Sequence, residues 1–187
     1  MTTRLQDWLT RQAERRPDAC AVVFGQQRLT YGELDVASNR FARALKGAGC
    51  RRGDRVALLL PKSIEAIVAM FAALKADCIY VPLDPSSPSA RLVHVLELCE
   101  SRCILAMDST AALLADIIEH GGLADSTQVG WMDENYSGRE VRGCFSWRDV
   151  LLLADSPVAS LNDDSHVRLD GPVERRCHHS LQCDPFH

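Results

Sequence analysis

Apolar residues in the first half of the chain fall into blocks that predict a strand, a helix and a second strand. Val56–Leu60 is an unbroken apolar run, which is typical of a parallel strand buried on both faces of a sheet. Ile79–Val81 is the next short strand, and Pro82 and Pro85 should end it because proline has no N–H for the ladder. This order predicts a right-handed βαβ unit. The intervening apolar residues recur at helical spacing: Ile64, Ile67, Val68, Phe71 and Leu74.

The N-terminal segment predicts a helix followed by a short hairpin. The apolar residues of this helix share one face: Leu5, Trp8 and Leu9. It should end before Pro17, since the residue before a proline avoids the helical conformation. Cys20–Phe24 and Arg28–Leu29 are expected to pair as strands across the turn at Gly25–Gln27.

A second helix should follow the hairpin directly. Thr30 and Glu33 have the spacing of a capping box, in which hydroxyl and carboxylate each accept a hydrogen bond from a free backbone N–H. The helix should run out near Gly47 and Gly49. Its predicted buried residues are Leu34, Ala37, Phe41 and Leu45.

Strands and helices continue to alternate after the βαβ unit. Ser87-Pro88 predicts a helix with serine as N-cap and proline at the first helical position. Cys103–Ala106 and Gln128–Met132 are predicted strands, and Ala111–Glu119 and Trp147–Leu153 are predicted helices. This alternation predicts an α/β lobe with an open, mainly parallel, doubly wound sheet, preceded by the short hairpin. The helix after Pro88 should bury Leu92, Val95, Leu96 and Cys99.

Length, charge and hydropathy narrow the class of protein. A chain of 187 residues with 47% apolar residues suits one domain, or one lobe of a larger domain. The net charge of -4 argues against a nucleic-acid partner, because nucleic acids select basic surfaces. No apolar run approaches the ~20 residues of a membrane span, and the first residues lack the apolar core of a signal peptide. We therefore expect a cytoplasmic protein with no nucleic-acid and no membrane partner.

The cysteines are expected to be reduced thiols. The chain has eight of them, and no secretory signal precedes them. The sequence contains no Cys-x-x-Cys pair of the kind found in zinc and redox sites. Four lie in apolar stretches and are predicted to be small core residues: Cys20, Cys78, Cys99 and Cys103.

Two motifs carry a resemblance to a known family. Leu74–Leu92 reads LKADCIYVPLDPSSPSARL and is similar to the second core motif of adenylation domains in nonribosomal peptide synthetases. Leu29–Leu34 reads LTYGEL and resembles the first core motif, and Asn39–Leu45 and Gly53–Ala57 match that family in position. From about Leu5 to about Ala106 the chain thus resembles the adenylate-forming superfamily, which also contains acyl-CoA synthetases and luciferases. The Val-Pro-Leu-Asp-Pro form favours the peptide-synthetase branch.

The resemblance implies the activity of a complete enzyme. Such an enzyme joins a carboxylate, expected to be that of an amino acid, to AMP from ATP with Mg²⁺, and releases pyrophosphate. It can share a longer synthetase with a carrier protein. In the family the first core motif plays a structural part, so Tyr31 and Glu33 receive no catalytic role, and we assign no catalytic, cofactor-binding or metal-binding residue in this chain. Asp77 stands where the family usually has glycine, and aspartate tolerates the left-handed conformation better than most residues.

The end of the sequence departs from the family. A phosphate loop rich in glycine, serine and threonine and ending in lysine should follow Asp163-Asp164, and the printed sequence has none. Residues 166–187 are instead rich in Arg, His and Cys and have neither helical nor strand period. If the codons for Val167–Arg175 are GTC CGG CTC GAC GGG CCC GTC GAA AGG, a frame shifted by one nucleotide reads Ser-Gly-Ser-Thr-Gly-Pro-Ser-Lys, and a glycine begins next.

The shifted frame can continue to His187 as Val-Val-Ile-Thr-His-Ser-Asn-Ala-Thr-His-Phe. The residues of the printed sequence fix the first two bases of most codons, and only third bases were chosen to fit. Our hypothesis is therefore a frame change at Ser165 or His166, through a small deletion or a mispredicted splice junction.

Other residues invite sharper interpretations that we do not favour. A metal cluster in the tail would use Cys177, His178, His179 and Cys183, but their spacing fits no familiar zinc finger, and an unstructured tail is preferred. His94 is expected to be a surface or edge histidine, and Asp84 a turn or cap residue. Asp163-Asp164 is expected to be a solvated loop pair.

These observations predict a domain organisation and two functions. Residues 1–161 are expected to form a partial N-terminal lobe of an AMP-binding adenylation domain, and residues 162–187 an aberrant, disordered tail. The leading hypothesis is a truncated adenylate-forming ligase domain, catalytically silent alone because it lacks the phosphate loop and the lobe with the catalytic lysine. The alternative is a non-catalytic α/β binding or interaction module that uses the apolar surface a missing half would cover. A zinc-binding protein ranks last.

Overall fold

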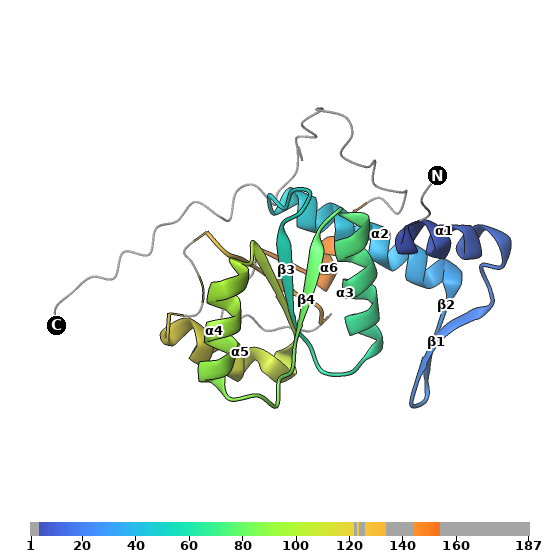
Figure 1. Cartoon of the computed structure of the whole chain (residues 1–187). Coiled ribbons are helices and arrows are strands. Elements are labelled where there is room, and N and C mark those ends of the chain that lie inside the picture. Colours follow the sequence, from blue (N-terminus) through green and yellow to red (C-terminus); the bar gives the residue numbers. More distant parts are fainter. Residues whose placement is uncertain (1–3, 122, 124–125, 134–143, 154–187) are drawn as a thin grey trace.

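A computed structural model of the chain describes residues 4–121, 123, 126–133 and 144–153. Its centre is a five-stranded, all-parallel sheet with strand order β4-β3-β5-β6-β7 (Figure 1). Parallel strands need helices on both faces of the sheet, and both faces are covered, which confirms the predicted doubly wound α/β lobe. The strands are β3 (Arg55–Leu59), β4 (Ile79–Leu83), β5 (Cys103–Ala106), β6 (Gln128–Trp131) and β7 (Phe145–Ser146).

The N-terminal elements lie beside the sheet as predicted. Helix α1 (Leu5–Arg15) leads into an antiparallel hairpin of β1 (Cys20–Phe24) and β2 (Gln27–Thr30), and helix α2 (Tyr31–Gly47) follows directly. The backbone N–H of Glu33 donates to Thr30 Oγ1 at 3.2 Å, and the N–H of Thr30 donates to Glu33 Oε2 at 2.8 Å. Both bonds satisfy donors that the first turn of α2 leaves free, which confirms the capping box.

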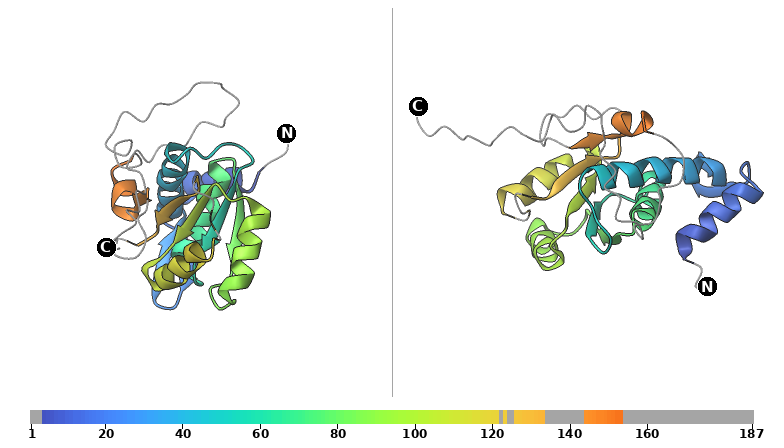
Figure 2. Two further views of the ribbon diagram at one scale, coloured as in Figure 1. Left: turned by 90° about the vertical axis from the view of Figure 1, so that its left-hand side faces the viewer. Right: turned by 90° about the horizontal axis from the view of Figure 1, so that it is seen from above.

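Two apolar cores hold the layers together. One lies between the sheet and α2, α3 (Ile64–Lys75) and α6 (Trp147–Leu151), and the other between the sheet and α4 (Ser89–Cys99) and α5 (Ala111–Glu119) (Figures 1 and 2). Side chains alternate between the two faces of a strand, so Val56 and Leu58 of β3 enter the first core, while Ala57 and Leu59 enter the second. This explains why β3 reads as an unbroken apolar run.

The βαβ unit differs from the prediction in two details. Strand β4 continues through Pro82, which is paired with Leu58, so the prediction that Pro82 ends the strand is wrong. Because β4 is an edge strand of the sheet, the missing N–H of the proline costs no ladder bond inside the sheet. Helix α3 buries Ile64 and Val68 as predicted, while Ile67, Phe71 and Leu74 are only half-buried. Its most deeply buried positions are small residues: Ala69, Ala72, Ala73 and, at its end, Ala76.

The second half follows the predicted order with shifted boundaries. Helix α4 begins at Ser89 with Pro88 as N-cap and no side-chain cap, so the predicted Ser87 cap is wrong. Strand β5 and helix α5 have the predicted bounds, and a 3-10 turn, Asp108–Thr110, joins them. Strand β6 ends one residue early at Trp131, and helix α6 ends at Leu151. Strand β7 was not predicted, because two residues make no readable pattern.

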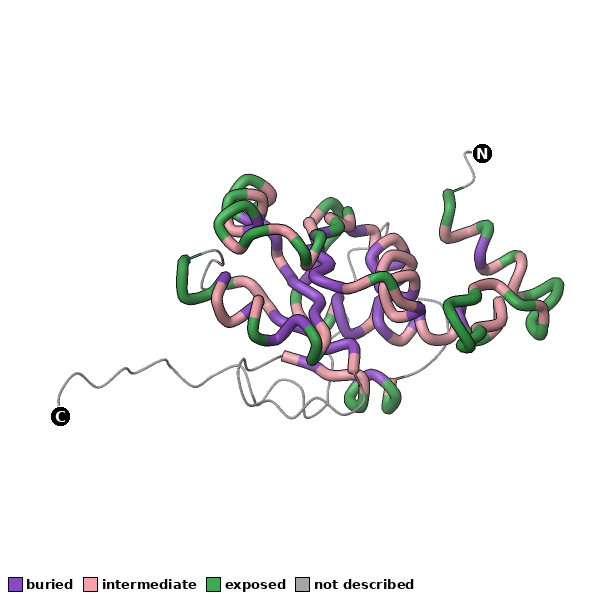
Figure 3. The backbone as a smooth tube through the Cα atoms, turned by 90° about the horizontal axis from the view of Figure 1, so that it is seen from below, coloured by how far each residue is buried: buried purple, intermediate pink, exposed green. Residues whose placement is uncertain are grey.

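Burial corrects one part of the cysteine prediction. Cys78 and Cys103 are buried, as expected of core residues, and Cys99 is half-buried. Cys20 is exposed, so its prediction as a core residue is wrong: it begins the hairpin, whose Ala21, Val22 and Leu29 pack against the first core while Cys20 itself stays exposed. Figure 3 shows that buried residues follow the strands of the sheet and the inner sides of the helices. Among the residues that the structure describes, no helix combines the length and apolar character needed to cross a bilayer.

Candidate functional site at the carboxyl edge of the sheet

The strand order creates a switch point at the carboxyl ends of β3 and β5. Strand β3 is followed by α3 on one face, whereas β5, its neighbour, is followed by α5 on the other face. The two chain segments therefore leave the carboxyl ends of β3 and β5 toward opposite faces of the sheet. Doubly wound folds bind ligands at such a switch point. We take the residues that follow β3, β4, β5 and β6 as the candidate site.

Thr110 ties the two sides of the switch point together. Its side chain is buried, and Oγ1 lies 3.0 Å from the carbonyl oxygen of Leu59, at the end of β3, and 2.9 Å from that of Met107. The same oxygen accepts a hydrogen bond of 3.1 Å from the N–H of Met107. Since its one hydroxyl proton is already shared between two carbonyl oxygens, Thr110 has no proton left to donate to a ligand. The residue fixes the loop after β5 against the end of β3.

Carboxylates gather on the β6 side of this edge. The backbone N–H of Asp108 donates to Oδ2 of Asp133, which lies two residues beyond β6. Burial raises the pKa of Asp133 above its usual value of 3.8, and the negative charges of Asp108 and Glu65 raise it further, while the Asp108 hydrogen bond opposes them. The charged form of Asp133 is therefore less stable than that of an ordinary exposed carboxylate, and the backbone N–H of Asp108 donates a hydrogen bond to it.

The β4 side of this edge carries a turn at Asp84 and an exposed lysine, Lys62. Asp84 directly follows β4 and accepts hydrogen bonds from Ser86, one from the N–H at 2.9 Å and one from the hydroxyl at 2.8 Å. These bonds lower the pKa of Asp84, and the charges of Lys62 and Arg91 lower it further. The arrangement is a turn closed by its aspartate, which confirms the structural interpretation of Asp84. Lys62, two residues before the N-terminus of α3, is exposed at the same edge.

The chemistry available at this edge is limited. Within the described ranges, no three His, Cys, Asp or Glu side chains form a group that could hold a metal ion. Asp108 and Asp133 are hydrogen-bonded at this edge, and Lys62 is exposed there. The hydrogen bonds of Thr110, Asp133 and Asp84 hold the segments at this edge together.

The other residues singled out in the sequence make contacts that fit a structural role. Tyr31 stacks edge-on against Trp8, with ring centroids 6.0 Å apart. His94 is exposed on α4, and its Nδ1 lies 3.9 Å from Glu97. Asp77 has the left-handed φ of 60° that was expected after α3, and its carboxylate accepts a hydrogen bond of 2.8 Å from Arg4. Asp163-Asp164, the phosphate-loop position and the Cys/His tail lie outside the described residues.

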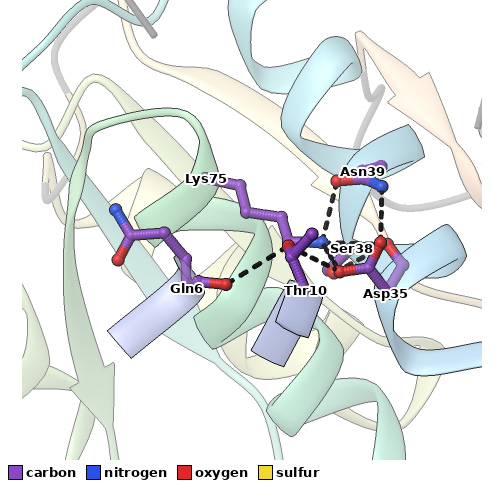
Figure 4. Close-up of polar contacts among 6 residues, drawn as sticks. All are labelled: Gln6, Thr10, Asp35, Ser38, Asn39 and Lys75. Carbon is purple, nitrogen blue, oxygen red and sulfur yellow. Dashed lines mark hydrogen bonds and ion pairs between the residues drawn. The ribbon is translucent and has the colours of Figure 1, made fainter. Parts of the chain in front are cut away.

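A buried polar cluster on the opposite side of the sheet from α4 was not predicted from the sequence. Lys75, at the end of α3, places its ammonium against α2, where Nζ donates to Asp35 Oδ1 at 2.7 Å, to the Asp35 carbonyl oxygen at 3.0 Å and to Asn39 Oδ1 at 2.8 Å (Figure 4). The three donors of the ammonium are thereby satisfied. The Lys75 side chain is 6% exposed and that of Asp35 13% exposed.

The cluster also joins α1 to the two longer helices. Asp35 Oδ1 accepts a second bond of 3.0 Å from Thr10 Oγ1, and Oδ2 accepts one of 2.9 Å from Asn39 Nδ2. Gln6 Nε2 donates to the carbonyl oxygen of Leu74 at 3.1 Å. Burial lowers the pKa of Lys75, and the hydrogen bond and charge of Asp35 oppose that effect. Because each polar group has a partner inside the protein and no nucleophile or open face is present, we assign this cluster a structural role.

Comparison with known proteins identifies relatives of the whole lobe. The family model described as AMP-binding enzyme matches residues 9–161. Surfactin synthase subunit 2 of Bacillus subtilis (strain 168) is 43% identical over 98 residues, which cover 52% of this chain and 3% of that protein. Zwittermicin A synthase ZmaJ of Bacillus cereus is 35% identical over 136 residues, which cover 72% of this chain and 26% of that protein. The chain thus spans only a small part of these relatives.

Solved structures agree on the fold. The anthranilate CoA ligase AuaEII, in complex with anthranoyl-AMP, superposes with a TM-score of 0.71 over 83% of this chain and 29% of that chain, at 21% sequence identity. The family match covers the hairpin, the βαβ unit and the strands as far as α6. The resemblance read from the two core motifs is confirmed, and the chain belongs to the AMP-binding enzyme family.

Proposed function

We propose that residues 1–161 are the N-terminal part of an adenylation domain whose complete protein activates an amino acid for nonribosomal peptide synthesis. In this reaction a carboxylate oxygen of the acid attacks the α-phosphorus of ATP, the bond to the β-phosphate breaks, and pyrophosphate leaves as the acyl-adenylate forms. The working context would be a cytoplasmic synthetase with a carrier protein, in secondary metabolism.

One observation carries the proposal: the family-model match over residues 9–161, which contains both core motifs in order. The peptide-synthetase branch is supported by the relatives, among them surfactin synthase subunit 2 at 43% identity. The fold is compatible with this function because the carboxyl edge of the sheet, at the switch point of β3 and β5, is a platform on which a phosphate loop can lie.

Within this chain, the described residues supply the platform and not the chemistry. In the described ranges no three His, Cys, Asp or Glu side chains form a group that could hold a metal ion, and the hydroxyl proton of Thr110 is already shared between two carbonyl oxygens. We therefore assign ATP binding and charge stabilisation to residues encoded in the shifted frame from Ser165 onward and beyond. The printed residues from Ser165 or His166 to His187 would then be a product of the frame change.

Amino-acid-dependent exchange of pyrophosphate into ATP tests the proposal. Two proteins are compared: the 187-residue chain as printed, and a longer protein in which the frame is restored at Ser165. We expect no exchange with the printed chain, and exchange that depends on a small set of amino acids with the longer protein. Exchange by the printed chain would refute the assignment of the chemistry. Exchange of the longer protein with aryl or fatty acids alone would refute the peptide-synthetase branch while leaving the family intact.

A further inference from the structure

The two sides of strand β4 differ in what they offer to a neighbouring strand. On its inner side β4 pairs in parallel with β3 along its whole length. The N–H of Ile79, the first residue of β4, donates to the carbonyl oxygen of Asp54 at 2.8 Å, on the β3 side. The backbone groups of successive residues in a strand point alternately to its two sides. The N–H and C=O groups of Ile79, Val81 and Leu83 therefore face β3.

The outer side of β4 carries the backbone groups of Tyr80 and Pro82. β4 is the first strand of the sheet, and in the part of the chain that the structure describes no strand pairs with this side. Tyr80 offers an N–H and a carbonyl oxygen there, whereas Pro82 offers only a carbonyl oxygen because proline has no N–H. Pro82 is exposed, and the side chain of Ile79 at the start of the strand is also open, with Ile79 55% exposed. Only the proline interrupts this edge.

This outer edge is complementary to a second copy of itself in the antiparallel direction. With Val81 opposite Val81 of the second copy, Tyr80 lies opposite Pro82 of that copy, and the same pair recurs on the other side of the two-fold axis. Residues that face each other in this way exchange N–H···O=C bonds in an ordinary antiparallel ladder. Ile79 would lie opposite Leu83 on the same face as Val81, so apolar pairs would accompany the ladder.

We propose that the outer edge of β4 is a self-pairing surface for a second copy of this chain, and that Pro82 keeps it closed. In each pair the Tyr80 N–H can donate to the Pro82 carbonyl oxygen, but nothing donates back to the Tyr80 carbonyl oxygen. The proline ring also fills the space into which an N–H would point, so it holds a partner strand beyond the usual spacing of about 4.8 Å. Proline on an exposed edge strand is a known protection against such pairing. This role does not depend on the adenylation reaction.

Light scattering on the full chain and two variants tests the proposal. Pro82→Val restores the outward N–H and removes the ring. Pro88→Val is the matched control, because Pro88 is also exposed but lies outside the sheet, at the N-cap of α4. We expect the average mass of Pro82→Val to rise with protein concentration toward twice that of the unsubstituted chain. Pro88→Val should keep the mass of the unsubstituted chain at every concentration.

Hydrogen exchange of single amides shows where the copies meet. In the unsubstituted chain the Tyr80 amide should exchange at least about tenfold faster than the amides of Ile79 and Val81, which donate to the β3 side. In concentrated Pro82→Val the Tyr80 amide should slow by about tenfold.

Three results would overturn the proposal. The first is a Tyr80 amide that is as protected as that of Val81 in the unsubstituted chain, since the edge would then not be open. The second is a Pro82→Val variant whose mass is unchanged, or whose mass rises while the Tyr80 amide stays unprotected. The third is an equal rise in mass for Pro88→Val. Because the first result comes from the unsubstituted chain, a variant that fails to fold cannot hide the answer.

Discussion

The buried ion pair between Asp35 and Lys75 should be the most sensitive polar contact of the lobe. Asp35→Leu removes one acceptor of the Lys75 ammonium and the partners of Thr10 and Asn39, and leaves the ammonium buried with two neutral acceptors. Removing one member of a buried ion pair costs about 3–5 kcal/mol, because the other charge stays uncompensated. Domains of this size are stable by only about 5–15 kcal/mol, so this single change should bring the lobe close to unfolding.

A double-mutant cycle separates the pair from the space it fills. Lys75→Met removes the ammonium and keeps the apolar stem, and we expect a cost of about 3–5 kcal/mol for the same reason. The double variant Asp35→Leu/Lys75→Met contains no buried charge, so its cost should be smaller than the sum of the two by about 2–3 kcal/mol. The free energy of unfolding is measured by urea titration of the full chain, followed by far-UV circular dichroism.

An exposed ion pair provides the matched control. Arg55 Nη2 lies 3.1 Å from Glu100 Oε2, and the Glu100 side chain is 82% exposed. Because exposed ion pairs contribute little, Glu100→Gln should change the free energy of unfolding by less than about 1 kcal/mol. If Asp35→Leu and Lys75→Met cost no more than this control, or if their costs simply add in the double variant, the cluster is not the buried, coupled pair that its geometry describes.

Three further predictions concern other parts of the lobe. Thr30→Ala removes the side-chain cap of α2 and should cost about 1 kcal/mol in urea unfolding, whereas Thr30→Ser should keep most of the stability. Gly130→Ala places a Cβ 2.4 Å from the ring of Phe145, between β6 and β7, and should cost about 1–3 kcal/mol; an unchanged stability would mean that β7 does not pack there. The pKa of Asp133 is raised above 3.8 in the folded state, so the folded chain binds the proton of this group more tightly than the unfolded chain does. The free energy of unfolding therefore falls as the pH rises from 3.8 through the raised pKa. Asp133→Asn should therefore stabilise the chain at pH 7 and lose this advantage near pH 3.8. A difference in thermal midpoint between this variant and the unsubstituted chain that stays constant from pH 3.8 to pH 7 would contradict the prediction.

The sequence predicts the elements well where local physics decides them. The capping box at Thr30 and Glu33 and the apolar run of β3 follow from residue chemistry over a few positions. The left-handed Asp77 was expected from the family resemblance, because the family usually has glycine at that position. Strand β4 shows the limit of this reasoning. Whether Pro82 ends a strand depends on whether that strand lies at the edge of the sheet, and local sequence does not give that order.

The polar interior of the lobe could not be predicted for a related reason. A lysine in the last turn of a helix usually faces solvent, and the carboxylate that holds Lys75 lies 40 positions upstream on another helix. Cys50 was not predicted as a core residue, yet it is buried in the same core as Cys78 and Cys103. Such contacts depend on tertiary packing, and the spacing of residues within one helix or strand cannot predict them.

Sequencing of the genomic DNA and the transcript from Asp164 to well beyond His187 tests the central claim most directly. The account predicts that one shifted frame encodes a glycine-, serine- and threonine-rich loop ending in lysine and continues into the rest of an adenylation domain. Codons in Val167–Arg175 that are incompatible with that loop, or a transcript without such a frame beyond His187, would contradict it. The function of the lobe would then have to be sought in binding rather than in catalysis.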